Sequence, residues 1–305
     1  MFYTLTANPS VDLNITSEGL VKNEVNRTRN AVYTTNGKGV NVSFALKHFG
    51  IDSCVLGFFG GFSGEYILSE CEKKGLKTAP ILLDGITRIN VFLNDGSGEY
   101  VMVNEGPEVP QEKQDEFLGL LERLEDAEYL CIGGSLPRDI STDYYDKILK
   151  ICEKTGTKVI IDISSPKLKD LLSYRPLLIK PNDQELREIF GMNLRSVDDV
   201  KSALLRLYEM GAQNILLTLG EKGSYFYNGK EFYSCDTYKV KLLSSACAGD
   251  CFLSAFLGVW LTDPSNVKKA LRLGAGAGAN AAESAGIGDL QNAAEYSKHI
   301  TVKKI

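Results

Sequence analysis

Short apolar runs alternate with longer amphipathic stretches along most of this 305-residue chain. The apolar runs have the length and composition of strands buried in a parallel sheet. They lie at residues 2–5, 54–59, 129–132, 158–163, 177–179 and 214–219. Helical periodicity fills the stretches between them, at residues 40–49, 64–74, 111–124, 142–154, 183–190 and 197–210. This alternation predicts an α/β fold with a mostly parallel central sheet and helices on both faces.

Two segments break the alternation. Residues 10–36 and 87–104 alternate polar with β-branched or aromatic side chains, the half-exposed pattern of an antiparallel sheet. The second segment contains Asn94-Asp95-Gly96, a hairpin signal. Both segments together predict one small β-sheet lid on an otherwise single domain spanning residues 1–305. Such a lid could exclude water from a site beside it.

The C-terminal part is expected to be rich in strands up to Leu243, with a hairpin over residues 223–235. Two helices should follow, over residues 249–261 and 266–283. The second carries glycines at positions 274, 276 and 278, and each costs about 1 kcal/mol within a helix. Close helix packing and contact with a flat ligand would account for them equally well.

Composition excludes several functional classes. The chain has 34 Lys+Arg and 39 Asp+Glu, a net charge of −5, which argues against nucleic-acid binding. No apolar run approaches the roughly 18 residues of a membrane span, and the N-terminus lacks a signal-peptide pattern. The seven scattered cysteines indicate reduced thiols in a cytoplasmic protein. A zinc site is not expected, because no Cys-x-x-Cys pair occurs and the chain has only two histidines.

The clearest chemical signal is a run of small residues at positions 244–250, which precedes an apolar helix. Small side chains leave the backbone N–H groups at a helix start uncovered, so they form an anion site. Asp250 lies in the first turn beside that site, where an acid can also simply stabilise the helix. Cys247 at this helix start could have a lowered thiol pKa. No GxxxxGK[ST] P-loop is present.

Eight short motifs, in their order and spacing, resemble those of the PfkB/ribokinase family of carbohydrate kinases. The chain is most similar to its sugar-phosphate branch, which holds 1-phosphofructokinase and tagatose-6-phosphate kinase. The motifs are Asn8-Pro9-Ser10-Val11-Asp12, Glu24-Val25-Asn26-Arg27, Gly37-Lys38-Gly39-Val40-Asn41-Val42, Thr87-Arg88-Ile89-Asn90, Gly134-Ser135-Leu136-Pro137, Lys180-Pro181-Asn182-Asp183-Gln184-Glu185, Thr218-Leu219-Gly220-Glu221-Lys222-Gly223 and Ala248-Gly249-Asp250. The resemblance implies a ribokinase-like fold.

Two positions depart from the family pattern. Asn36 and Cys247 stand where the family motifs GGKG and GAGD begin with glycine. Glycine at the second position would tolerate a backbone angle that a β-carbon resists. We therefore expect the anion-site geometry, and with it the turnover rate, to depend on Cys247.

The resemblance implies ATP-dependent phosphoryl transfer with Mg²⁺. Asp250 would be the general base, and the amides of residues from Cys247 through Ala248 and Gly249 to Asp250 would stabilise the transferring phosphoryl group. Asn182 and Glu185 would contact Mg²⁺ through water, although the same pair could be a capping box. The other residues implied to bind the nucleotide are Lys180, Thr218, Gly220, Gly223 and Asn280.

The residues implied to bind the sugar phosphate lie in the N-terminal motifs, the lid and the segment after residue 133. They are Asp12, Arg27, Gly37, Lys38, Asn41, Arg88, Asn90, Ser135 and Arg138. Lys38 is expected in a glycine-flanked loop, with its ammonium free to reach a phosphate. Arg27 is expected to end a strand of the lid. Three arginines suggest an acceptor that carries its own phosphate, although Arg27 and Arg138 could equally be surface charges.

Fructose 1-phosphate is the first choice of acceptor, ahead of tagatose 6-phosphate and fructose 6-phosphate. A kinase of ribose or a nucleoside is an alternative, as is a sugar-phosphate-binding protein that has lost turnover through Cys247. The expected partners are therefore small molecules, with no nucleic acid and no membrane, and the lid offers a surface for a homodimer.

Overall fold

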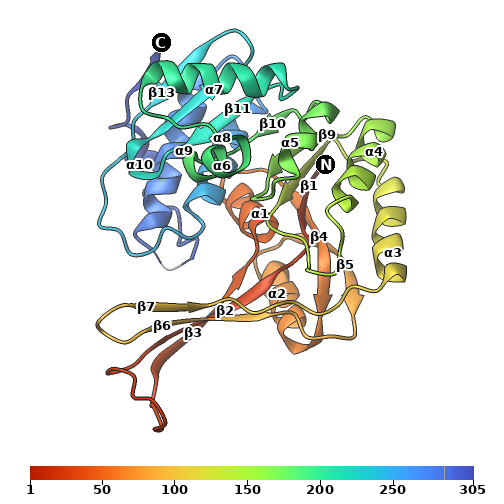
Figure 1. The fold of residues 1–305 in the computed structure, drawn as a ribbon, viewed down its shortest axis with the longest axis vertical. Coiled ribbons are helices and arrows are strands. Elements are labelled where there is room, and N and C mark those ends of the chain that lie inside the picture. The colour runs from red at the N-terminus through yellow and green to blue at the C-terminus, as the bar shows by residue number, and fades with distance from the viewer. Residues whose placement is uncertain (285) are drawn as a thin grey trace.

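A ten-stranded sheet forms the centre of the computed structural model, which describes residues 1–284 and 286–305 (Figure 1). Seven neighbouring strands pair in parallel. In sheet order these are β5 (Lys77–Leu83), β4 (Ser53–Gly60), β1 (Phe2–Thr6), β8 (Tyr129–Gly133), β9 (Lys158–Asp162), β10 (Leu178–Ile179) and β11 (Ile215–Thr218). Three antiparallel strands complete the sheet, namely β12 (Ser224–Tyr227), β13 (Phe232–Cys235) and β14 (Val302–Lys304).

Helices cover both faces of this sheet, as the sequence predicts. One face packs against α3 (Gln111–Glu122), α4 (Tyr144–Thr155), α6 (Asp183–Phe190) and α7 (Val197–Glu209). The other packs against α1 (Lys38–His48), α2 (Gly61–Lys73), α8 (Ala248–Trp260) and α9 (Val267–Ala282). Shorter helical segments are α5 (Leu168–Leu171), η1 (Leu172–Tyr174), η2 (Gly220–Lys222) and α10 (Ala293–Ser297). Neighbouring side chains of a strand point to opposite faces, so Phe2 and Tyr3 enter different cores.

The lid is a four-stranded sheet that projects from the main body (Figure 1). Its order is β3 (Arg29–Asn36), β2 (Ser10–Thr16), β6 (Ile89–Asn94) and β7 (Glu99–Met102). The expectation of a wholly antiparallel lid is wrong, because β2 and β6 pair in parallel. The hairpin at residues 94–96 is confirmed, since it joins β6 to the antiparallel β7. The parallel register places Asp12 directly beside Asn90.

Two further expectations about strands are corrected. Residues 236–247 form neither strand nor helix, so the strand-rich part ends at Cys235 and not at Leu243. Strands β5 and β14 both lie at the edges of the large sheet and were not predicted. Within the described part of the chain, no helix has the length and apolar character needed to cross a membrane.

The glycines of α9 allow close packing between helices. A β-carbon at position 276 would lie 2.3 Å from the carbonyl oxygen of Ala293, at the start of α10. A β-carbon at position 274 would lie 2.9 Å from the ring of Phe252 in α8. Of helix packing and contact with a flat ligand, these distances favour helix packing.

Candidate active site

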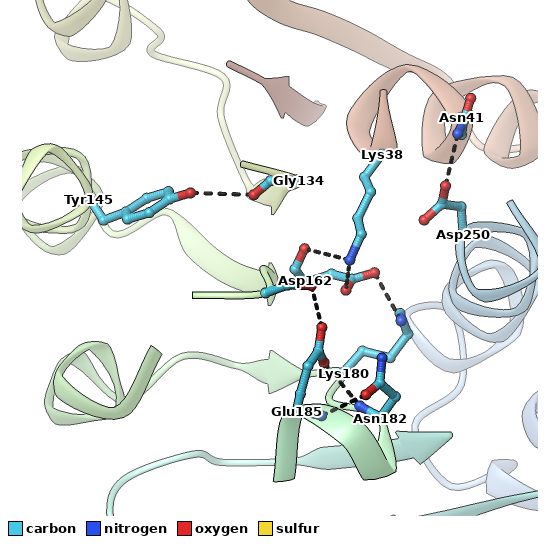
Figure 2. Close-up of polar contacts among 10 residues, drawn as sticks. Lys38, Asn41, Gly134, Tyr145, Asp162, Lys180, Asn182, Glu185 and Asp250 are labelled. Atoms are coloured by element: carbon cyan, nitrogen blue, oxygen red, sulfur yellow. Dashed lines mark hydrogen bonds and ion pairs between the residues drawn. The ribbon is translucent and has the colours of Figure 1, made fainter. Parts of the chain in front are cut away.

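The polar motifs gather where the parallel strands end. The segments that follow β1, β8, β9, β10 and β11 all leave the same edge of the sheet. Ligands of open α/β sheets bind at this edge. Helix α8 begins there, and Asp250 in its first turn has only 6 % of its surface exposed. The side-chain amide nitrogen (Nδ2) of Asn41, from α1, donates a hydrogen bond of 2.9 Å to Asp250 Oδ2 (Figure 2).

Burial raises the pKa of Asp250 to about 6, and the negative charge of Asp162 adds to this rise. The ammonium of Lys38 and the hydrogen bond from Asn41 oppose it. A carboxylate with a pKa near 6 is ionised at neutral pH and still basic enough to accept a proton. Its position and pKa therefore suit a general base.

A buried ion-pair cluster lies beside Asp250. Asp162 ends strand β9, and its two carboxylate oxygens face Lys38 Nζ at 2.7 Å and Lys180 Nζ at 3.0 Å (Figure 2). Burial alone would raise the pKa of Asp162, but the two ammonium groups outweigh burial and lower it. Burial similarly opposes the charge of Lys38, while the carboxylates of Asp162 and Asp250 hold its pKa above the usual value.

The expectation of a free Lys38 in a loop is wrong, because this residue begins α1 and pairs with Asp162. Its neighbour Gly37 has φ = 136°, and a β-carbon there would lie 2.4 Å from Thr6 Cγ2. The glycine therefore lets α1 start directly against the end of β1.

The start of α8 has the backbone geometry expected of an anion site. Cys247 adopts φ = 63°, the left-handed conformation that favours glycine. The first helical hydrogen bond runs from the Cys251 amide to the Cys247 carbonyl, so the amides of Ala248, Gly249 and Asp250 point away from the helix body. The expected low thiol pKa is wrong, because burial and the charges of nearby carboxylates raise the pKa of Cys247.

The side chain of Lys180 also approaches the start of α8. A β-carbon at Gly249 would lie 3.2 Å from Lys180 Nζ, so the ammonium group reaches the first turn of α8. Glycine at this position leaves room for the approach. The turn therefore combines backbone N–H groups with a nearby cation, which is suited to a phosphate.

A second polar cluster surrounds Asp12 in the lid. Asp12 Oδ1 accepts hydrogen bonds from Asn90 Nδ2 at 2.8 Å and from Ser10 Oγ at 3.0 Å. Asp12 Oδ2 accepts one from Asn36 Nδ2 at 2.5 Å. Asn36 Oδ1 in turn accepts from Asn41 Nδ2 at 2.9 Å. A continuous chain of hydrogen bonds therefore links Asp12 to Asp250.

The three candidate arginines lie in different surroundings. Arg88 donates to the backbone carbonyls of Asn8 at 3.0 Å and Pro9 at 3.4 Å, and it lines a cavity of about 590 Å³. Burial lowers the pKa of Arg88.

Arg138 is exposed and pairs with Glu105 at 2.5 Å. Arg27 is exposed in the loop before β3, so the expectation that it ends a strand is wrong. Ser135 is exposed after β8.

The residues assigned to the nucleotide are less closely grouped. Asn182 and Glu185 form a complete capping box at the start of α6, with bonds of 2.8 and 3.0 Å. Thr218 forms a parallel bridge with Asn182, so these two strand ends are adjacent. The side chain of Asn280 instead bonds to neighbours in its own C-terminal region, Glu283 and Asn292.

The two glycines expected to bind the nucleotide, Gly220 and Gly223, have different surroundings. Gly220 faces open space, whereas a β-carbon at Gly223 would lie 2.2 Å from the Cys235 carbonyl oxygen in β13. Gly223 thus has a packing role within the sheet.

Two residues at the centre of the site were missed by sequence reasoning. Asp162 is an acid at the carboxyl end of a buried strand, a signal that could have identified it. Asn36 was noted only as a departure from the family pattern. Neither its bond to Asp12 nor its bond to Asn41 could be read from the sequence, because both depend on how the lid meets α1.

Known proteins resemble this chain in sequence and in fold. The profile of the pfkB family of carbohydrate kinases matches residues 6–293. D-tagatose-1-phosphate kinase of Klebsiella oxytoca is 42% identical over 305 residues, covering 100% of both chains. 1-Phosphofructokinase of Bacillus subtilis is 34% identical over 288 residues, covering 94% of both. The tetrameric inhibited form of phosphofructokinase-2 from Escherichia coli superposes with a TM-score of 0.87 at 25% identity, covering 97% of this chain and 99% of that one. The fold, the motifs and these similarities together show that the chain belongs to the pfkB family of carbohydrate kinases, enzymes that transfer a phosphoryl group to a sugar hydroxyl.

Proposed function

We propose that this protein uses ATP to phosphorylate a ketohexose 1-phosphate, giving a hexose bisphosphate and ADP. The observation that carries the proposal is Asp250, a buried carboxylate at the start of α8 that is linked by hydrogen bonds to Asp12 in the lid. The similarity to a D-tagatose-1-phosphate kinase and a 1-phosphofructokinase supports the 1-phosphate class of acceptor. D-Tagatose 1-phosphate therefore joins fructose 1-phosphate as a first candidate, ahead of the two 6-phosphates.

Asp250 acts as the general base in this proposal. The acceptor hydroxyl lies against its carboxylate and loses its proton to it as the oxygen attacks the γ-phosphate of ATP. The new bond forms between the sugar oxygen and phosphorus, and the bond from phosphorus to the oxygen of ADP breaks. Asn41 holds the carboxylate in place through the bond to Oδ2.

Positive charge and backbone amides would stabilise the transferring group. Lys38 and Lys180 both lie beside Asp162, and Lys180 also approaches the first turn of α8. The amides of Ala248 and Gly249 add donors at the same place. These groups would bind negative charge that develops on the phosphoryl oxygens.

Oxygen donors near the end of β10 fit a hydrated magnesium ion. Glu185 is buried at the start of α6, and its carboxylate oxygens accept hydrogen bonds from the backbone N–H of Asn182 and from Ser164 Oγ. Each oxygen retains capacity for a second donor such as a metal-bound water. Mg²⁺ keeps most of its waters in proteins, and when bound it neutralises charge on the nucleotide phosphates. Asn182 and Glu185 would hold it through those waters.

The lid would bind the sugar phosphate. Asp12 and Asn90 offer polar groups for sugar hydroxyls, and Arg88 is the best placed of the three arginines for the existing phosphate. The exposed strand β7 carries Tyr100 and Val101 at the surface, each about half exposed. These apolar side chains support pairing of two lids in a homodimer. The seven free cysteines fit a location in the reducing cytoplasm.

The test is an ADP-release assay over D-tagatose 1-phosphate, D-fructose 1-phosphate, the two 6-phosphates and ribose. We expect one of the 1-phosphates to give the highest kcat/KM, and Asp250→Asn to be inactive with it. Activity should fall below pH about 6, where Asp250 becomes protonated. Turnover of ribose above all the phosphates would refute the proposed acceptor class. A shift in melting temperature with a sugar phosphate but no ADP would indicate a binding protein without turnover.

A further inference from the structure

Asn36 occupies the junction between the two halves of the site. It is the last residue of β3, and its backbone precedes the start of α1. Its side-chain oxygen accepts hydrogen bonds from the Gly37 amide at 2.6 Å and from Asn41 Nδ2 at 2.9 Å. These two donors fix the orientation of the amide, so its nitrogen must be the atom that faces Asp12 Oδ2. One side chain therefore contacts both the lid and α1.

The donors around Asp12 restrict what this carboxylate can still bind. An ionised carboxylate offers about four lone-pair positions. Ser10 and Asn90 use both positions on Oδ1, and Asn36 uses one on Oδ2. A single acceptor position remains, on Oδ2, and its direction is set by the bond from Asn36. Asp12 is itself buried, with 6 % of its surface exposed, so water does not compete freely for that position.

We propose that Asn36 is a positioning residue that makes Asp12 selective for one configuration of a sugar hydroxyl. The inference rests on the proposed function, in which Asp12 binds a hydroxyl of the acceptor. D-Tagatose and D-fructose differ in the direction of one hydroxyl, at C4. A carboxylate with one remaining acceptor direction distinguishes such epimers, because the wrong epimer leaves a buried polar group unpaired. Without Asn36, Oδ2 has two free positions and the carboxylate can turn toward either epimer.

Substitution by glycine and by aspartate tests two consequences of this arrangement. Asn36→Gly removes the donor to Asp12 but leaves the Asn41 bond to Asp250 in place. We expect KM for the preferred ketohexose 1-phosphate to rise about tenfold, with kcat changed less than about threefold. We expect selectivity to fall: the ratio of kcat/KM between tagatose 1-phosphate and fructose 1-phosphate should move at least about fivefold closer to unity.

Asn36→Asp keeps the shape of the side chain and places a second carboxylate against Asp12. Two carboxylates this close cannot both ionise readily, and the guanidinium of Arg88, which also acts on Asp12, only partly offsets their repulsion, so they share a proton at lower pH. We expect KM for the sugar phosphate to increase with pH between 5.5 and 8 in this variant, by more than it does in the wild type. This pH dependence would show that the side chain at position 36 acts on the Asp12 carboxylate, and the epimer ratio of the same variant would show whether it controls selectivity.

Asn30→Gly is the matched control. Asn30 lies six residues earlier on the same strand, is exposed, and donates to Thr16 Oγ1 at the other end of β3. Its φ of 56° suits glycine, so we expect unchanged KM and an unchanged epimer ratio. Urea unfolding of each variant shows whether it is folded, and the aspartate variant decides the question if Asn36→Gly does not fold.

An epimer ratio and KM within twofold of the wild type in Asn36→Gly, or a fall in kcat alone, would overturn the assignment. So would a KM of Asn36→Asp that follows the wild type across the pH range. Failure of the proposed function is separate, because it would appear as wild-type protein that turns over neither 1-phosphate.

Discussion

Replacing Asp250 by asparagine is expected to stabilise the protein at neutral pH while it abolishes phosphoryl transfer. Burial raises the pKa of Asp250 from its ordinary value of 3.8 to about 6. A difference of one pKa unit corresponds to about 1.4 kcal/mol. The folded state therefore loses about 3 kcal/mol by keeping this carboxylate ionised at pH 7.5. Asparagine has nearly the same shape, and its carbonyl oxygen can still accept the hydrogen bond from Asn41.

The pH dependence gives the sign of the effect. The folded protein binds the Asp250 proton more tightly than the unfolded chain does, so the wild type loses stability as pH rises from about 4 to about 6. The variant lacks this loss. Its advantage in free energy of unfolding should be about 1 kcal/mol at pH 4.5 and about 3 kcal/mol at pH 7.5. Urea denaturation of both proteins at the two pH values measures the difference.

A control and a nucleotide-binding measurement complete this experiment. Asp52 is an exposed acid whose pKa is lowered by its hydrogen bond with Lys47, so Asp52→Asn should give no stability gain at neutral pH. Asp250→Asn should still bind ATP in equilibrium dialysis, because the amides and lysines of the anion site remain. If the stability advantage of Asp250→Asn over the wild type does not grow between pH 4.5 and 7.5, the claim that the ionised carboxylate is disfavoured is refuted. Near-normal kcat would end its assignment as the base.

Three further substitutions, the last with a matched control, test separate parts of the site and the fold. Cys247→Gly removes a β-carbon from a left-handed residue, so it should raise the free energy of unfolding by about 1 kcal/mol and preserve or raise kcat; a large fall in kcat would show that the thiol has its own role. Arg88→Ala should raise KM for the ketohexose phosphate at least about tenfold in the ADP-release assay, as for a lost charge-assisted contact; an unchanged KM would favour a neutral acceptor. Gly276→Ala should lower the free energy of unfolding by about 1–3 kcal/mol, because its β-carbon would meet the Ala293 carbonyl at 2.3 Å. Gly119→Ala in α3, where the nearest atom belongs to a flexible arginine, should instead stabilise by up to about 1 kcal/mol, and equal effects in urea unfolding would contradict the packing argument.

The central sheet was predictable because its strands are buried on both faces. Runs such as residues 54–59 contain almost no polar side chains, and in a chain that alternates with helices this pattern is typical of central parallel strands. Edge strands carry a weaker signal. β5 contains Pro80 and an exposed lysine at its start, and β14 contains two exposed lysines, so neither reads as an apolar run.

The motif residues were predictable from resemblance, but their contacts were not. Lys38 and Asp162 are 124 positions apart, and their pairing depends on α1 and β9 meeting at one edge of the sheet. The parallel pairing of β2 and β6 similarly depends on the path of the chain between the two lid segments, which polar alternation does not encode. Local patterns therefore identify the elements, whereas the tertiary fold decides which charges meet.

The charges that meet here have a consequence for Asp250 as the proposed base. The two ammonium groups of Lys38 and Lys180 face the carboxylates of Asp162 and Asp250, and the buried carboxylate of Glu185 also acts on Lys38. In the proposed reaction Asp250 becomes neutral as it accepts the hydroxyl proton, so the total charge of these side chains rises by one positive unit. That charge appears beside the start of α8 at the moment when negative charge spreads over the transferring phosphoryl oxygens. In this proposal, proton acceptance by Asp250 and stabilisation of the transition state are coupled through the same buried lysines.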